Sequence, residues 1–190
     1  MPDPDVAAMR RLANGDDIAL NEIMRRWQQR VASFLLRMTG NHATACDLAQ
    51  ETFTNLYHSR GRYREDAAFS SYLLRIAANL ARNHHRWQSR HHAEPLEALE
   101  NAEPASEAAG PDAALALADT AREVRHAIRR LPHDLREALV LASYEEMSYA
   151  DIASMTDCTV KAVETRIYRA RQILKDKLAH LSTAGDSLPG

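Results

Sequence analysis

Apolar residues in the first half of the chain recur at the three- and four-residue spacing of amphipathic helices. A first segment follows the turn-forming residues 14–16 and predicts one helix or two from Ile18, Ile23, Trp27, Val31, Phe34 and Leu35. A second carries one apolar stripe, formed by Ala45, Leu48, Thr52, Phe53 and Leu56. In a third segment, residues 69–87, the residues expected to face inward are Phe69, Tyr72, Leu73, Ile76 and Leu80. These segments predict a small helical bundle.

The second half of the chain continues with helical patterns. Residues 115–131 predict a helix that Pro132 ends, and residues 134–143 predict another. Ser148 and Asp151 then have the spacing of a capping box that opens a short helix, whose inward side chains are Ile152, Ala153 and Met155. No segment alternates for long enough to predict a strand. The fold class is therefore expected to be all-α, with two small helical domains.

The last two predicted helices have helix-turn-helix spacing. Residues 156–158 form the turn, and Thr159 is a plausible N-cap for the longer helix. The apolar stripe of that helix is Val160, Val163, Ile167, Ala170 and Leu174. Its other face carries Thr159, Lys161, Ala162, Thr165, Arg166 and Arg169. Small residues permit close approach to a groove and long bases reach phosphates and guanine edges, so DNA binding is one interpretation; a solvated basic face is the other.

Charge separates the two halves. Residues 1–92 hold 13 Arg and no Lys against 9 acids, residues 93–121 hold 7 acids and no Lys or Arg, and residues 122–190 hold 11 basic and 10 acidic side chains. Residues 93–111 are rich in Ala, Glu and Pro, which predicts a flexible acidic linker between the domains. Pro111 is well placed to begin the helix that follows.

The composition excludes several classes of protein. No apolar run reaches the length of about 20 residues that spans a bilayer, and the N-terminus lacks the order of a signal peptide, so we expect a cytoplasmic protein with no membrane insertion. Cys46 and Cys158 fall one in each half and predict small buried thiols rather than a disulfide. A histidine cluster raises the alternative of a metal site: His84, His85, His91 and His92. Because arginines lie among these histidines and no Cys or acid stands at ligand spacing, we expect no metal and no cofactor.

Two stretches of the chain resemble a known family. Residues 129–174 resemble region 4 of bacterial RNA polymerase sigma factors, with the landmarks Leu131-Pro132, Arg136, Ser148-Tyr149-Ala150, Ile152-Ala153, Val160, Val163, Arg166 and Arg169-Ala170-Arg171. Independently, "DLAQETFTNLY" and "FSSYLLRIAANLARNHHR" resemble region 2. The two regions joined by a short linker are the layout of the extracytoplasmic-function (ECF) group. Three positions depart from the family pattern: Asp157 replaces the usual Gly, Thr159 a common Pro and Glu164 a common Lys.

The resemblance implies a function in transcription initiation, without covalent chemistry. Residues 1–92 would be region 2, 93–111 the linker, 112–182 region 4 and 183–190 a flexible tail. The −35 element would be bound by Thr159, Lys161, Ala162, Thr165, Arg166 and Arg169. The −10 element would be bound and melted by Tyr63, Arg64, Arg75, Asn79, Arg82, Asn83 and Arg86. Core polymerase would be bound by Asp47, Gln50 and Glu51. The implied partners are core RNA polymerase (the β′ clamp helices and the β flap), promoter DNA and an anti-sigma factor.

Two other classes remain as alternatives. A free-standing transcriptional regulator would carry an N-terminal ligand or phosphoacceptor domain, but the first 92 residues lack the strand pattern of such domains. A metal-dependent hydrolase that uses the histidines would need nearby carboxylates, and residues 84–92 contain none.

Overall fold

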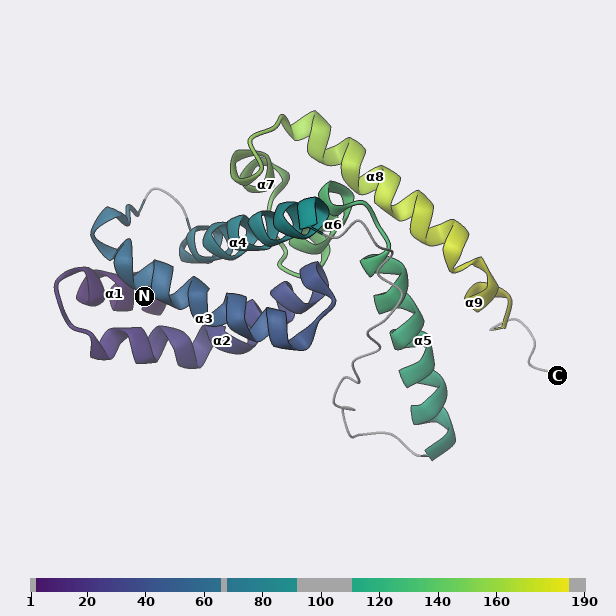
Figure 1. The fold of residues 1–190 in the computed structure, drawn as a ribbon, viewed down its shortest axis with the longest axis horizontal. Helices are drawn as coiled ribbons and strands as arrows, with labels where there is room; N and C mark the ends of the chain where they lie inside the picture. The colour runs from purple at the N-terminus through teal and green to yellow at the C-terminus, as the bar shows by residue number, and fades with distance from the viewer. Residues whose placement is uncertain (1–2, 66–67, 92–110, 185–190) are drawn as a thin grey trace. The chain divides into compact units, whose positions relative to one another are not determined.

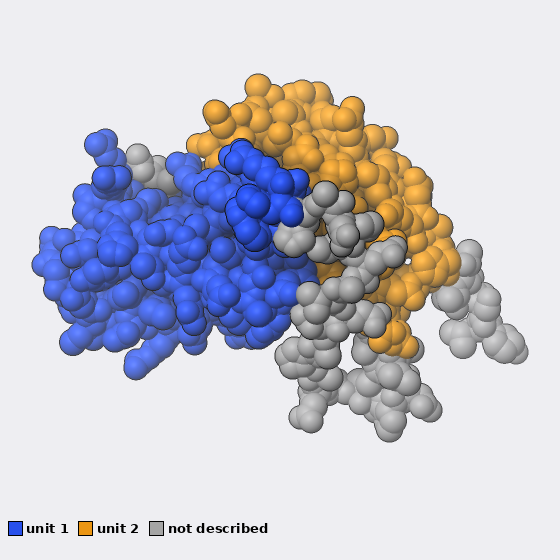
Figure 2. Space-filling model, viewed as in Figure 1, with its two compact units in different colours: residues 1–99 blue, residues 100–190 orange. Residues whose placement is uncertain are grey.

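The computed structural model describes residues 3–65, 68–91 and 111–184, and every regular element in those ranges is a helix (Figure 1). The chain divides into two compact units, residues 1–99 and 100–190 (Figure 2). These observations confirm the prediction of an all-α fold with two helical domains. Apart from Pro111, the predicted linker lies outside the described residues.

Unit 1 is a bundle in which helix α2 packs along α3 and both contact α4. Its described elements are α1 (Pro4–Ala13), α2 (Ile18–Thr39), α3 (His42–His58), the 3-10 turn η1 (Arg60–Arg62) and α4 (Phe69–His91). Helices α2 and α3 are joined tightly because Gly40 takes a left-handed conformation with φ 71° and donates its N–H to the carbonyl of Leu36 at 2.8 Å. The Asn41 side chain then caps α3 by accepting the N–H of Thr44 at 3.0 Å.

The stripe predicted for α3 is fully buried in the core, and the stripes predicted for α2 and α4 need correction. Ile18 opens α2 but is 68% exposed, whereas the next residue, Ala19, is fully buried. On α4, Tyr72, Ile76 and Leu80 are only half-buried. The buried face of α4 is instead formed by Phe69, Ser71, Leu73, Leu74, Ala77, Ala78 and Ala81. Three of these seven residues are alanines, which the prediction from large apolar side chains did not include.

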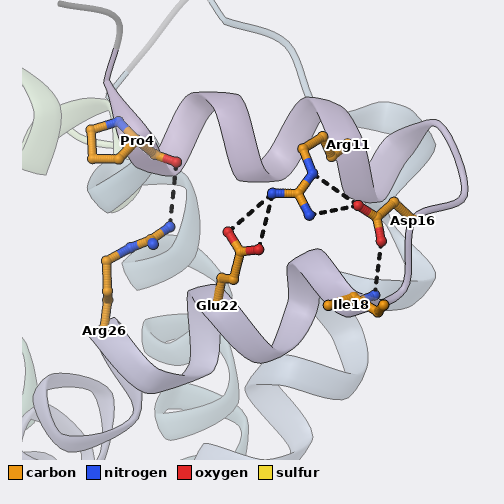
Figure 3. A network of polar contacts seen from close by, with 6 residues as sticks. All are labelled: Pro4, Arg11, Asp16, Ile18, Glu22 and Arg26. Atoms are coloured by element: carbon orange, nitrogen blue, oxygen red, sulfur yellow. Dashed lines mark hydrogen bonds and ion pairs between the residues drawn. The ribbon is translucent and has the colours of Figure 1, made fainter.

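Helix α1 was not predicted from the sequence. It is ten residues long, and its buried side chains are Ala8, Met9 and Leu12. Arg11 joins α1 to the rest of the bundle by hydrogen bonds to Asp16, at 2.8 Å, and to Glu22 on α2, at 3.0 Å (Figure 3). The hydrogen bond from Arg11 holds the pKa of Asp16 below its usual value. The Arg11–Asp16 contact therefore contributes its stability at neutral pH and is lost as pH falls through that lowered pKa.

A second set of contacts fixes the start of α1. Asp5 accepts the indole N–H of the buried Trp27 at 2.9 Å and the Nε–H of Arg26 at 2.6 Å. Arg26 also donates to the carbonyl of Pro4 at 3.3 Å (Figure 3). At the far end of α1, Arg10 forms a two-pronged ion pair with Glu65 in the segment that precedes α4. Helix α1 thus connects α2 to that segment.

We expect Asp5→Ala to destabilise unit 1 by about 1–3 kcal/mol, because it leaves the buried indole N–H of Trp27 without an acceptor. Urea unfolding followed by Trp27 fluorescence, in a Trp87→Phe background, measures this loss. Asp17→Ala is the control, since Asp17 is exposed and makes no side-chain capping bond. Equal midpoints for the two variants would contradict the assigned role of Asp5.

Unit 2 contains the described helices α5 (Pro111–Arg129), α6 (His133–Ser143), α7 (Tyr149–Met155), α8 (Val160–Lys177) and α9 (Ala179–Ala184). Pro111 begins α5, as the sequence predicts. Residues 183 and 184, at the start of the predicted tail, belong to α9. A bond from the Leu181 N–H to the Leu178 carbonyl, at 3.0 Å, starts that helix immediately after α8.

Helices α7 and α8 form the predicted helix-turn-helix. Ser148 Oγ accepts the N–H of Asp151 at 3.1 Å, and Thr159 Oγ1 accepts the N–H of Ala162 at 3.1 Å, which confirms both predicted N-caps. Asp157 holds the left-handed turn position with φ 51°, and the N–H of Cys158 bonds the Ala153 carbonyl at 3.0 Å. The turn therefore keeps the geometry that a glycine would favour, although an aspartate occupies it.

Candidate nucleic-acid and polymerase interfaces

A shallow hollow lies beside the N-terminal half of α8. The sequence-predicted −35 residues all line it: Thr159, Lys161, Ala162, Thr165, Arg166 and Arg169. Asp134 and Leu135, from the first turn of α6, complete the lining. The structure therefore brings together the whole set of six predicted residues and adds two that the sequence analysis did not name.

The buried stripe of α8 determines which side chains face the hollow. Val163, Ile167 and Ala170 are almost fully buried, whereas Val160, which was predicted to face inward, is 43% exposed at the helix start. On the outer face, Lys161 donates to Glu164 at 3.0 Å and remains highly exposed. Glu164 therefore neutralises part of the lysine charge.

The two arginines of the hollow differ in their surroundings. Arg169 is exposed and has no side-chain partner among the residues that the structure describes. Arg166 is partly enclosed, with its side chain 28% exposed, and lies between Asp134 and Cys158. Arg169 is thus free to reach a phosphate or base, whereas Arg166 is held by neighbours in its own unit.

Helix α4 presents a basic face in unit 1. It carries four arginines and no acidic residue over its length. Four of the predicted −10 residues are exposed there and the fifth, Arg82, is half-buried: Arg75, Asn79, Arg82, Asn83 and Arg86. Arg82 donates a hydrogen bond to the Asn79 amide oxygen, which orients that amide. Because phosphates need neutralising and separated bases need hydrogen-bond partners, this face has the composition of a single-strand contact.

Tyr63 and Arg64 precede α4 and lie differently. The Tyr63 ring packs edge-on against Tyr72 and Phe69, with ring centroids 5.1 and 6.2 Å away. Its hydroxyl is buried, and this burial raises the pKa of Tyr63. Arg64 is exposed. Tyr63 therefore packs within unit 1 in this structure, and its contact with an extruded base stays a prediction.

The predicted polymerase-binding residues share one exposed face of α3. Asp47, Gln50 and Glu51 all lie on the side opposite the buried stripe. The caps at both ends of α3 and its contacts with α2 and α4 hold this face outward. The geometry agrees with the prediction, and the polymerase contact itself stays a prediction.

The histidines of α4 form an aromatic stack. Trp87 stacks on His91 with centroids 4.9 Å apart and on His84 at 6.3 Å, and it is 52% exposed. Burial lowers the pKa of His84, which disfavours its charged form at neutral pH. Within the described ranges, no three His, Cys, Asp or Glu side chains gather as metal ligands. His92 lies outside those ranges, and both cysteines are half-buried thiols.

Sequence comparisons match both units to one family. The profile for sigma-70 region 2 matches residues 23–91, and the profile for sigma-70 region 4 matches residues 121–174. The RNA polymerase sigma-H factor of Pseudomonas aeruginosa is 33% identical over 183 residues, which cover 93% of this chain and 95% of that protein. The ECF RNA polymerase sigma-E factor of Escherichia coli K12 is 32% identical over the same length, with 93% and 95% covered.

Solved structures share this fold. CnrH, solved in complex with the cytosolic domain of CnrY, has a TM-score of 0.69 and 25% identity, and covers 94% of this chain and 99% of its own. The sigma factor RpoE of Bartonella quintana, solved with the anti-sigma factor NepR, has the same fold with a TM-score of 0.70 and 20% identity, over 84% of this chain and 96% of its own.

The chain therefore belongs to the sigma-70 family of RNA polymerase sigma factors, in its ECF group. Members of this family are transcription initiation factors rather than enzymes. None of the helices in the described ranges is long and apolar enough to cross a membrane.

Proposed function

We propose that this chain binds core RNA polymerase in the cytoplasm, recognises the −35 and −10 elements of a promoter and promotes melting of the DNA at the start site. The observation that supports this most strongly is the hollow beside α8, because the six residues expected to contact the −35 element all line it. The proposed divisions are region 2 at residues 1–92, the linker at 93–111, region 4 at 112–182 and a tail at 183–190.

Each exposed face has a separate task in this proposal. The N-terminal half of α8 enters the major groove, where Lys161 and Arg169 contact phosphates or bases and the small Ala162 permits close approach. The basic face of α4 holds the separated −10 strand, with Asn79 on a base edge and the arginines on phosphates. Asp47, Gln50 and Glu51 on α3 bind the β′ clamp helices, and unit 2 binds the β flap.

An anti-sigma factor is the proposed regulator. Similar chains were solved with protein partners, one of which is named as an anti-sigma factor. A partner protein that covers α3 would block polymerase binding, because the acidic face of that helix is the proposed site for core enzyme. The chain itself performs binding and strand separation and needs no cofactor.

We expect Arg169→Ala to weaken binding to −35 DNA. Loss of a phosphate contact makes the decrease of log affinity with log salt less steep, by about one unit of slope. Loss of a base contact instead costs about 1–3 kcal/mol of binding free energy and relaxes specificity at one position. Binding of holoenzyme to promoter fragments across a salt series distinguishes the two. Arg171→Ala is the matched control, since Arg171 is exposed on the same helix but does not line the hollow. Equal losses in both variants would remove the hollow as the DNA contact.

A further inference from the structure

The guanidinium of Arg166 joins three parts of unit 2. Its Nε lies 3.7 Å from Asp134 Oδ2, an ion pair to the first turn of α6. Its Nη1 donates to the sulfur of Cys158 at 3.5 Å, in the turn between α7 and α8. Cys158 is in turn 3.2 Å from the hydroxyl of Thr156, at the end of α7. Arg166 therefore contacts α6 and the turn while it belongs to α8.

Arg166 also lines the hollow where DNA is proposed to bind. Its contacts to Asp134 and Cys158 both lie within unit 2. An arginine reads guanine through a fixed, planar pair of donors, so its value for recognition depends on how its plane is oriented. Contacts at Nε and Nη1 restrain the orientation of that plane.

Asp134 is an unexpected lining residue for a DNA-binding hollow. Its side chain is 56% exposed, and a carboxylate close to phosphates is repelled by them. Asp134 lies in the first turn of α6, where the helix dipole stabilises a negative charge. The dipole does not account for its contact with Arg166 on another helix.

We propose that Asp134, together with Cys158, is a positioning residue that orients the Arg166 guanidinium for sequence readout at the −35 element. This inference rests on the proposed function of α8 and assigns to Asp134 a role in specificity. The carboxylate weakens attraction to DNA of any sequence, and in return it holds one arginine in the geometry that discriminates between bases.

We expect Asp134→Asn to raise affinity for unselected DNA and to lower discrimination at the base pair that Arg166 reads. Removal of the negative charge raises affinity for unselected duplex DNA, because repulsion of phosphates is lost. Loss of the ion pair lets the Arg166 plane rotate, so discrimination at the base pair that it reads falls by about 5- to 150-fold, the range of one bidentate contact. A purely structural role would move both affinities in the same direction.

The test uses the full chain assembled with core RNA polymerase. The probes are a duplex with a randomised −35 segment, the sequences that wild-type holoenzyme selects from it, and the unselected pool. The measured quantity is the ratio of affinity for selected over unselected DNA, with base preference scored at each position. Thermal unfolding of each variant confirms that unit 2 is folded.

Glu164→Gln is the matched control. It removes the same charge from the same DNA-facing region, but Glu164 pairs with Lys161 rather than Arg166. We expect it to raise non-specific affinity as Asp134→Asn does while leaving the preference at the base pair that Arg166 reads unchanged. Cys158→Ala, which removes the second contact to Arg166, should reduce discrimination at the same position as Asp134→Asn.

A double mutant completes the design. If Asp134 acts through Arg166, then adding Asp134→Asn to Arg166→Ala causes no further loss of discrimination. Unchanged discrimination in Asp134→Asn, or an equal loss in Glu164→Gln, would overturn the inference and leave the proposed function standing. If wild-type holoenzyme selects no sequence from the randomised segment, the proposed function of α8 fails instead.

Discussion

Asp47→Arg combined with Glu51→Arg is expected to abolish association of the chain with core RNA polymerase. Both carboxylates are exposed on α3, and neither makes a side-chain bond within the described residues, so the substitutions disturb no internal contact. Reversal at a docking surface places like charges opposite each other, which costs several kcal/mol. Co-purification with core enzyme measures the loss, and circular dichroism confirms that the helices remain.

Arg75→Ala combined with Asn79→Ala is the reciprocal control for that result. These residues lie on the exposed face of α4 assigned to DNA, so core association should persist while strand opening falls. Permanganate reactivity of unpaired thymines near −10 reports the opening. Loss of core binding in this variant, with normal binding in the charge-reversed one, would exchange the assignments of the two faces.

Promoter binding by the free chain is expected to be weak, and binding by the chain with core polymerase strong. Non-specific affinity comes mainly from phosphate neutralisation, and the two basic segments of the sequence carry net charges of only +4 and +1 around one of −7. We therefore expect a dissociation constant of about 10⁻⁴ to 10⁻⁶ M for the free chain, the range of non-specific complexes.

Core enzyme changes this affinity by holding both DNA-binding faces at their elements. Once one unit is bound, the other acts at a high effective concentration, so two weak contacts combine into one strong one. We expect the complex to reach about 10⁻⁸ M or tighter, as specific protein–DNA complexes do. The gain of about a hundredfold or more requires no new contact from the chain itself.

Local sequence signals predicted the elements that carry the candidate sites. The capping residues Ser148 and Thr159 marked the starts of α7 and α8, and both form the expected bonds. The stripe of α3 was equally clear because five apolar or small residues repeat on one face. A capping residue and an apolar stripe each depend on residues that are close together in the sequence, so both can be predicted from the sequence alone.

Features that depend on contacts between distant segments were not predictable in this way. Helix α1 has only two large buried side chains, and its attachment depends on Arg11 and Asp5 meeting residues of the following turn and helix. Asp134 is more than 30 positions from Arg166 in the sequence, and only the packing of α6 against α8 brings them together. The buried face of α4 likewise includes three alanines, which the predicted stripe of large apolar residues did not reveal.

A gel-shift series at about 0.15 M salt, with and without core RNA polymerase, measures whether promoter binding by this chain depends on core enzyme. The probe is a promoter fragment identified from transcripts that core enzyme makes only when this chain is added. We expect no defined shift by the chain alone at concentrations where the chain with core enzyme forms a sequence-specific complex. Tight, sequence-specific binding by the chain alone would contradict this expectation and would favour a free-standing regulator.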